Sequence, residues 1–229
     1  MPITEFLARN ARLYGDEISL IERNPELQGR REVTWREFEL IEPNPPGLFR
    51  RQITWREFDN KANQFANLLL QRGIKKGDKV AILLLNCLEW LPIYFGVLKT
   101  GALAVPLNFR YTAEEIRYCL NLSEADALVF GPEFIDRLET ILDQIPRVKL
   151  RFFVGEDCPS FAESYERLTA ECSTEAPSIK LTDDDRAAIY FSSGTTGFPK
   201  AILHSHRSLV SACETEQKHH GQTREDNFL

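Results

Sequence analysis

The stretch AAIYFSSGTTGFPKAIL, residues 187–203, decides the fold of this chain. Its first five and last three residues are apolar runs that suit buried strands, so residues 192–200 are predicted to form a loop between two strands. Gly194 and Gly197 let the main chain approach a ligand closely, and the serine and threonine hydroxyls add hydrogen-bond donors beside the backbone amides. A loop of this composition forms a nest for anionic oxygen atoms.

Lys200 adds a positive charge at the end of this loop, directly after Pro199, whose φ angle is fixed. The predicted ligand is therefore a polyphosphate. A Gly/Ser/Thr linker has a similar composition, but linkers rarely lie between two apolar strands and end in Pro-Lys. The P-loop of nucleoside triphosphatases needs Gly-Lys-Ser/Thr after a four-residue gap, whereas Gly194 is followed five positions later by Pro199. That spacing excludes the Walker motif.

The segment from Ile189 to Lys200, continued by Ser205-His206 and Leu209, resembles the phosphate loop of AMP-forming adenylating enzymes. Residues 98–108, LKTGALAVPLN, are similar to the LKxGxxxVPLN segment of that superfamily, and residues 53–58, ITWREF, are similar to its LTYxEL segment. Residues 108–116, NFRYTAEEI, resemble the N-x-R-x-T-x-E-E-I of its acyl-CoA synthetases. The chain is thus identified as the N-terminal part of an AMP-forming acyl-CoA synthetase.

This resemblance implies a reaction in two steps. A carboxylate attacks the α-phosphate of ATP, bound with Mg2+, to give an acyl-adenylate and pyrophosphate, and the thiol of coenzyme A then displaces AMP. The resemblance assigns the β- and γ-phosphates to the loop and makes Lys200 the catalytic residue that compensates charge on the leaving pyrophosphate. A fatty or aromatic carboxylic acid is the expected substrate. The expected nucleotide-binding residues are Ser192, Ser193, Gly194, Thr195, Thr196, Gly197 and Lys200.

Strands and helices alternate along the chain, which predicts an α/β fold with a mostly parallel β-sheet flanked by helices. The resemblance identifies this fold as an incomplete N-terminal domain of the adenylate-forming synthetases. Capping boxes at Thr54 with Glu57 and at Thr112 with Glu115 mark the starts of two helices. Other helices are expected near residues 4–14, 88–99 and 134–144, and strands at 18–22, around Val33, and at 80–85, 105–106, 127–130 and 150–154.

Two subdomains are expected, with residues 171–180 as the seam between them. Residues 1–180 would form the first, and residues 181–229 the phosphate loop and the start of the next. The family's ribose-binding aspartate, hinge and C-terminal domain do not occur in these 229 residues. We therefore expect the chain to be inactive alone and to self-associate through uncovered apolar surface. A stand-alone nucleotide- or acyl-binding protein with a regulatory or assembly role is the alternative.

A tandem duplication covers residues 20–59. Residues 20–39, LIERNPELQGRREVTWREFE, align without gaps on residues 40–59, LIEPNPPGLFRRQITWREFD, with twelve identities in twenty positions. Two copies are too few for a solenoid. Prolines at 43, 45 and 46 interrupt the first copy, so Trp35 is expected to start an aborted turn in an extra surface hairpin. The alternative is a partner-docking element with Trp35 and Phe38 exposed.

The composition limits the possible partners and compartments. The 28 basic and 34 acidic residues give a net charge of −6, which does not favour a nucleic-acid partner. The five cysteines are scattered, and no two form a C-x-x-C pair. This pattern favours a reducing compartment, so we expect a cytoplasmic protein. None of the cysteines has a recognisable base partner that would make it a nucleophile. No signal peptide is expected, and the most apolar stretch, residues 90–98, is too short to span a bilayer.

No metal site formed by the chain alone is predicted. His204 and His206 are expected to alternate along one strand, but no third ligand lies nearby in the sequence. Residues 183–185, three consecutive aspartates, are expected to form a charged turn before the strand at Ala187. His219 and His220 are expected to be solvated at the end of a helix.

Overall fold

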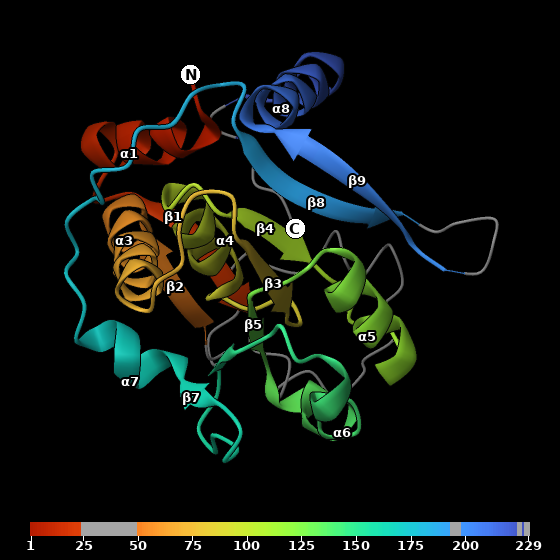
Figure 1. The fold of residues 1–229 in the computed structure, drawn as a ribbon. Helices are drawn as coiled ribbons and strands as arrows, with labels where there is room; N and C mark the ends of the chain where they lie inside the picture. The colour runs from red at the N-terminus through yellow and green to blue at the C-terminus, as the bar shows by residue number, and fades with distance from the viewer. Residues whose placement is uncertain (24–49, 193–197, 224–225, 227–229) are drawn as a thin grey trace, which may run out of the picture.

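A computed structural model describes residues 1–23, 50–192, 198–223 and 226 (Figure 1). At its centre lies a seven-stranded sheet with the strand order β7-β6-β5-β3-β4-β8-β9. Neighbouring strands are parallel, except that β8 and β9 form an antiparallel hairpin. The predicted mostly parallel sheet is thereby confirmed. The strands are β3 (Lys79–Leu83), β4 (Leu103–Pro106), β5 (Ala127–Phe130), β6 (Leu150–Phe153), β7 (Glu163–Ser164), β8 (Arg186–Ser192) and β9 (Lys200–Ser205).

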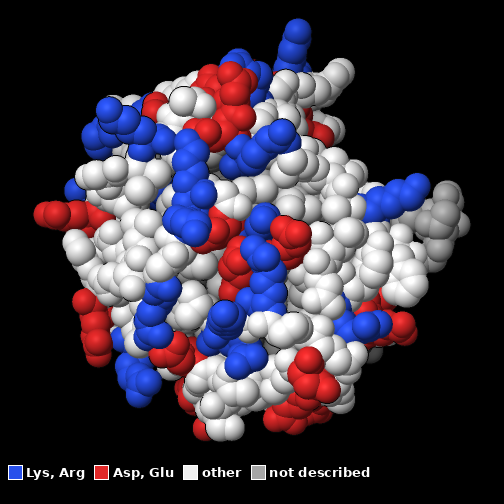
Figure 2. Space-filling view, viewed as in Figure 1, with Lys and Arg blue, Asp and Glu red and all other residues white. Residues whose placement is uncertain are grey.

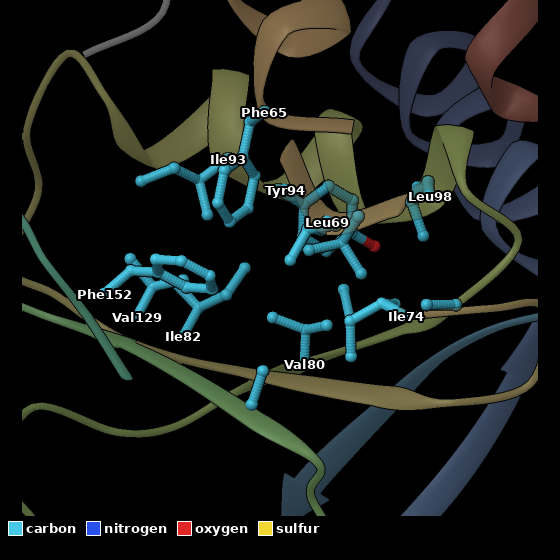
Figure 3. Close-up of a cluster of buried hydrophobic side chains, with 14 of the residues drawn as sticks. Phe65, Leu69, Ile74, Val80, Ile82, Ile93, Tyr94, Leu98, Val129 and Phe152 are labelled. Carbon is cyan, nitrogen blue, oxygen red and sulfur yellow. The ribbon is translucent and has the colours of Figure 1, made fainter. Parts of the chain in front are cut away.

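Helices cover both faces of this sheet. Side chains alternate between the two faces of a strand, so β3 directs Val80 and Ile82 to one face and Ala81 and Leu83 to the other. The first pair packs with α3 (Trp55–Gln71) and α4 (Trp90–Lys99), and the second with α5 (Ala113–Leu122) and α6 (Ile135–Glu139). Figure 3 shows the first of these cores, in which side chains of α3 and α4 meet those of the sheet.

The two helices on the first face pack closely because Gly96 lies between them. A Cβ atom at Gly96 would come within 2.9 Å of the carbonyl oxygen of Ala62 and 3.0 Å of the Phe65 ring. Lys99 at the end of α4 is buried, and its ammonium group donates to the Asp59 carboxylate and the Asn63 side-chain oxygen, each at 2.6 Å. The LKTG segment therefore helps to fix α4 against α3.

Both predicted capping boxes are present. Thr54 caps α3 together with Glu57, and Thr112 caps α5 together with Glu115. The prediction of one helix over residues 134–144 is wrong. The helix α6 ends at Glu139, and it is preceded by the 3-10 turn Pro132–Phe134 and followed by the 3-10 turn Leu142–Gln144. The Thr140 hydroxyl donates to the carbonyl of Arg137 at 2.8 Å, which occupies an acceptor at the helix end.

A second, two-stranded sheet pairs β1 (Ile18–Arg23) with β2 (Arg50–Thr54). In the order of the chain these strands lie between α1 (Ile3–Leu13) and α3. β1 therefore takes most of its residues from the first copy of the duplication, and β2 comes from the second. The strand expected around Val33 and the aborted turn expected at Trp35 lie outside the described residues.

Residues 171–185, which include the expected seam, form an irregular link from α7 (Tyr165–Ala170) to β8. The side chains of Asn63 and Asn67 in α3 donate to carbonyl oxygens of this link, at 2.8 Å each to Thr174 and Ser173. After β9 the chain continues into α8 (His206–His220), which ends with the exposed His219 and His220 as expected.

The described helices include none that is both long and apolar enough to cross a bilayer. In Figure 2 acidic and basic side chains are interspersed over the visible face.

Candidate functional site

The predicted phosphate loop joins the two strands of the β8–β9 hairpin. Ser192, the last residue of β8, is the register partner of Lys200, the first residue of β9. Residues 193–197 lie outside the described residues, and with them Ser193, Gly194, Thr195, Thr196 and Gly197. The structure therefore brings together two of the expected site residues, Ser192 and Lys200, on opposite sides of the loop mouth.

Lys200 is exposed. Within the described parts of the chain, its ammonium group has neither a hydrogen-bond nor an ion-pair partner. A lysine without an internal partner keeps its charge available for a ligand.

A pair of tyrosines holds the strand that leads into the loop. The hydroxyl groups of Tyr190 in β8 and Tyr94 in α4 lie 2.7 Å apart, within hydrogen-bond distance, and burial raises the pKa of both side chains. The Tyr190 ring also lies against the ring of His204 in β9, with 5.0 Å between the ring centres. These contacts connect the part of β8 next to the loop to the buried core.

A second aromatic contact lies on the other side of the loop. Phe198 packs against Tyr118 of α5, with 4.7 Å between the ring centres. Pro199 is buried, although Phe198 before it and Lys200 after it are exposed. Tyr190, before the loop, and Phe198, within its second half, thus contact helices on opposite faces of the sheet. The sequence analysis did not single out Tyr94 or Tyr118, because their partners are 96 and 80 positions away.

The structure changes the expectation for the two histidines that follow. His204 lies on β9, but His206 is the first residue of α8, after the capping residue Ser205, so the two do not share a strand. His206 is fully buried, and neither ring nitrogen has a partner among the described residues. Burial lowers the pKa of His206, so this side chain is neutral at neutral pH. His206 directly follows β9 at the end of the hairpin opposite the loop.

The three aspartates before β8 make structural contacts. Asp185 accepts hydrogen bonds from the Lys76 ammonium group and from the backbone amide of Thr182, each at 2.7 Å. The carboxylate of Asp184 accepts from the Arg207 guanidinium at 2.9 Å. These contacts connect the turn before β8 to the start of α8, as a charged turn would.

A separate cavity of about 590 Å3 lies at the carboxyl ends of β3, β5 and β6. From β3 the chain continues to α4 on one face of the sheet, whereas from β4 and β5 it continues to α5 and α6 on the other. The connections after the neighbouring strands β3 and β5 therefore lie on opposite faces of the sheet. Ligands of open α/β sheets bind in the crevice that forms at such a point. The cavity is lined by Leu84, Leu85, Gly131, Pro132, Val154 and Gly155, among others.

Charged side chains form the rim of this cavity. The Arg51 guanidinium pairs with Glu89 at 2.8 Å and also with Glu22. Burial and the Glu89 carboxylate raise the pKa of Cys87 to about 12, so its thiol is not a nucleophile at neutral pH. The described residues of the predicted phosphate loop do not line this cavity, although β8 runs parallel to β4 and the loop leaves the same edge of the sheet.

Comparisons with known proteins agree with this geometry. The model of a family described as "AMP-binding enzyme" matches residues 8–229. The long-chain-fatty-acid–CoA ligase FadD13 of Mycobacterium tuberculosis is 36% identical over 155 residues, which are 67% of this chain and 30% of the relative. A 3-hydroxybenzoate/4-hydroxybenzoate–CoA ligase of Thauera aromatica is 34% identical over 167 residues, or 71% of this chain and 31% of the relative.

Solved structures show the same fold. The anthranilate CoA ligase AuaEII, crystallised with anthranoyl-AMP, superposes with a TM-score of 0.78 and 26% identity, over 93% of this chain and 36% of that chain. The N-terminal domain of FACL13 from Mycobacterium tuberculosis gives a TM-score of 0.75 and 25% identity, over 95% of this chain and 47% of that domain. The chain spans less than a third of the length of the two curated relatives.

Proposed function

The chain belongs to the AMP-binding enzyme family, and we propose that it is the N-terminal part of an ATP-dependent, AMP-forming carboxylic acid:CoA ligase. The named relatives act on fatty and aromatic acids, which supports a substrate of one of these two classes. The complete enzyme would join the acid to AMP, release pyrophosphate, and then transfer the acyl group to the thiol of coenzyme A.

In this proposal the loop from Ser192 to Lys200 holds the polyphosphate of ATP. Backbone amides and hydroxyls of residues 193–197 would donate to the β- and γ-phosphate oxygens, and the Lys200 ammonium would neutralise charge on the departing pyrophosphate. The observation that carries the proposal is the pairing of Ser192 with Lys200, which is exposed and has no partner among the described residues, across the loop mouth. Mg2+ would enter with the substrate, because this ion is usually bound through substrate phosphates.

We further propose that the 229 residues alone do not catalyse adenylation, because they match less than a third of the relatives' length. Acid-dependent exchange of pyrophosphate into ATP tests this: no exchange is expected from the 229-residue chain, and exchange is expected from a chain that continues through the length of the relatives. Robust exchange by the short chain would contradict the inactivity. Nucleotide binding without exchange in the long chain would favour the alternative, a nucleotide- or acyl-binding protein with a regulatory or assembly role.

The role of Lys200 is tested by the two half-reactions of the long chain. Lys200→Ala should slow adenylation by about 10²- to 10³-fold, the usual effect of removing one group that stabilises developing charge. Thioester formation from the isolated acyl-adenylate should change much less, because pyrophosphate has already left. Single-turnover kinetics of each step measure this difference, and an equal loss in both steps would contradict the assigned role.

Three further expectations complete the proposal. Residues 181–229 would begin a second subdomain, and the chain would work in the cytoplasm, where its free cysteines stay reduced.

Self-association would occur through β9, which is an edge strand. Its side chains Ile202 and Leu203 are 44% and 46% exposed. Sedimentation velocity over a concentration series tests the last point, and a monomer at every concentration would contradict it.

A further inference from the structure

An aromatic contact joins the second half of the predicted phosphate loop to α5. The rings of Phe198 and Tyr118 have their centres 4.7 Å apart and their planes inclined by 33°. We propose that Tyr118 is a positioning residue of this site, which acts through Phe198 to hold the Lys200 ammonium group where it meets the polyphosphate. This inference rests on the proposed function, because it concerns how the same loop binds its ligand.

Tyr118 gives the loop a fixed point of contact. The helix α5 starts at a capping box, and its buried residues Ile116, Cys119 and Leu120 belong to the core on the α5 side of the sheet. Tyr118 is partly buried and packs against the same core cluster. The cap and the three buried side chains hold α5 in place. The Tyr118 ring therefore has a set position beside the loop end of the hairpin (Figure 1).

The connection from Phe198 to Lys200 is short and stiff. Pro199 is the single residue between them. A proline fixes its own φ angle and also restricts the conformation of the residue before it. Pro199 is buried, although both of its neighbours are exposed. A constraint on the Phe198 ring is therefore transmitted to Lys200 across a segment with few free dihedral angles.

Strand pairing holds Lys200 from the other side. Lys200 is the register partner of Ser192, and the next residue of β9 pairs with Phe191. Phe191 packs against the same core cluster as Tyr118. The backbone at Lys200 is thus held between the ladder to β8 and the contact of Phe198 with Tyr118. The aromatic contact involves side chains alone, so it can be removed without the loss of a backbone hydrogen bond.

A lysine that is already in place loses less conformational freedom when it meets an anion, and binding is tighter by that difference. The usual contribution of an aromatic pair corresponds to a factor of about 2 to 12 in an equilibrium constant. Removal of the ring contact should therefore weaken polyphosphate binding by a factor in this range. Removal of the Lys200 charge should weaken it more, because the charge itself meets the ligand.

A double-mutant cycle of Tyr118→Ala and Phe198→Ala tests the proposal. The measured quantity is the dissociation constant of the 229-residue chain for pyrophosphate with Mg2+, from an NMR titration. Each single variant should bind about 2- to 12-fold more weakly than the unmodified chain, and the double variant no more weakly than the weaker single variant.

Two further variants separate positioning from stability. Tyr118→Phe keeps the ring and should bind like the unmodified chain. Tyr111→Ala is the matched control, because Tyr111 is also a partly buried tyrosine that packs against the same core cluster. It should bind like the unmodified chain as well. If Tyr118→Ala fails to fold, Tyr118→Leu takes its place in the cycle, since leucine keeps apolar bulk but has no ring.

Unchanged or tighter binding in Tyr118→Ala would overturn the proposal, and so would independent effects of the two substitutions or an equal loss in Tyr111→Ala. Lys200→Ala separates this inference from the proposed function. If Lys200→Ala loses binding and Tyr118→Ala does not, the role of Tyr118 alone is wrong. If Lys200→Ala binds like the unmodified chain, or if the unmodified chain does not bind, the proposed role of the loop is wrong and this inference with it.

Discussion

The two hairpins of the molecule, β1–β2 and β8–β9, serve different purposes. In the first, Ile53 is 5% exposed and packs with Leu7 and Phe58. In the second, β9 exposes Ile202 and Leu203 by 44% and 46%. The first hairpin therefore stabilises the domain through its side chains. The second contacts the helices through a few aromatic side chains next to its loop, Tyr190 and Phe198, and exposes apolar side chains on β9.

The largest effect that tests this difference comes from matched truncations. Ile53→Ala should cost about 3 kcal/mol of unfolding free energy, because it removes buried methyl groups and leaves a cavity. Ile202→Ala, the same change on β9, should cost less than about 0.5 kcal/mol, because the side chain is already half in water. Urea denaturation of both variants measures the two values. Similar losses would show that both hairpins are structural.

A pH dependence tests how the second hairpin is anchored. The folded pKa of His206 is lowered by burial, so the unfolded chain binds the proton more readily. Stability should be unaffected above about pH 6.5, the unfolded pKa, and fall below it by at most about 1.4 kcal/mol per pH unit until the folded pKa is passed.

His206→Leu should flatten this part of the profile, while His219→Leu, at an exposed position of the same helix, should leave it as in the unmodified chain. Unfolding in urea between pH 5 and 7.5 measures both. A profile that His206→Leu does not change would mean that another group causes the pH dependence.

A smaller effect is expected from shortening the link of the first hairpin. Deletion of residues 24–43 removes one repeat length and reduces the link from 26 residues (24–49) to six (44–49). Closing a shorter loop costs less entropy, so the free energy of unfolding should rise by about 1.3 kcal/mol. Chemical denaturation of the deletion variant measures this gain. A clear loss of stability would mean that the inserted repeat contributes packing of its own.

Local signals made much of this fold predictable. Thr54 with Glu57 and Thr112 with Glu115 mark helix starts within a few residues, and apolar runs such as Ala127–Phe130 mark buried strands. The break after Glu139 was not predicted from periodicity; at this point the Thr140 hydroxyl donates to the carbonyl of Arg137.

Contacts between distant residues were less accessible to sequence reasoning. The Tyr94–Tyr190 hydrogen bond joins residues that no spacing rule connects. The contacts of Asp16 with Arg56 and of Ser19 with the Ile53 carbonyl join residues more than thirty positions apart, and no spacing rule connects these either. For the loop itself, the composition and order of residues predict a polyphosphate ligand, and the structure added the position of Ser192 and Lys200 at its mouth.

The claim that the β8–β9 loop binds polyphosphate is tested most directly by NMR titration of the 229-residue chain with pyrophosphate and Mg2+. We expect chemical-shift changes concentrated at residues 192–200 in the unmodified chain and in Lys61→Ala, a control at an exposed position of α3, and greatly weakened binding in Lys200→Ala. Shift changes that avoid residues 192–200, or that are the same in Lys200→Ala, would contradict the claim.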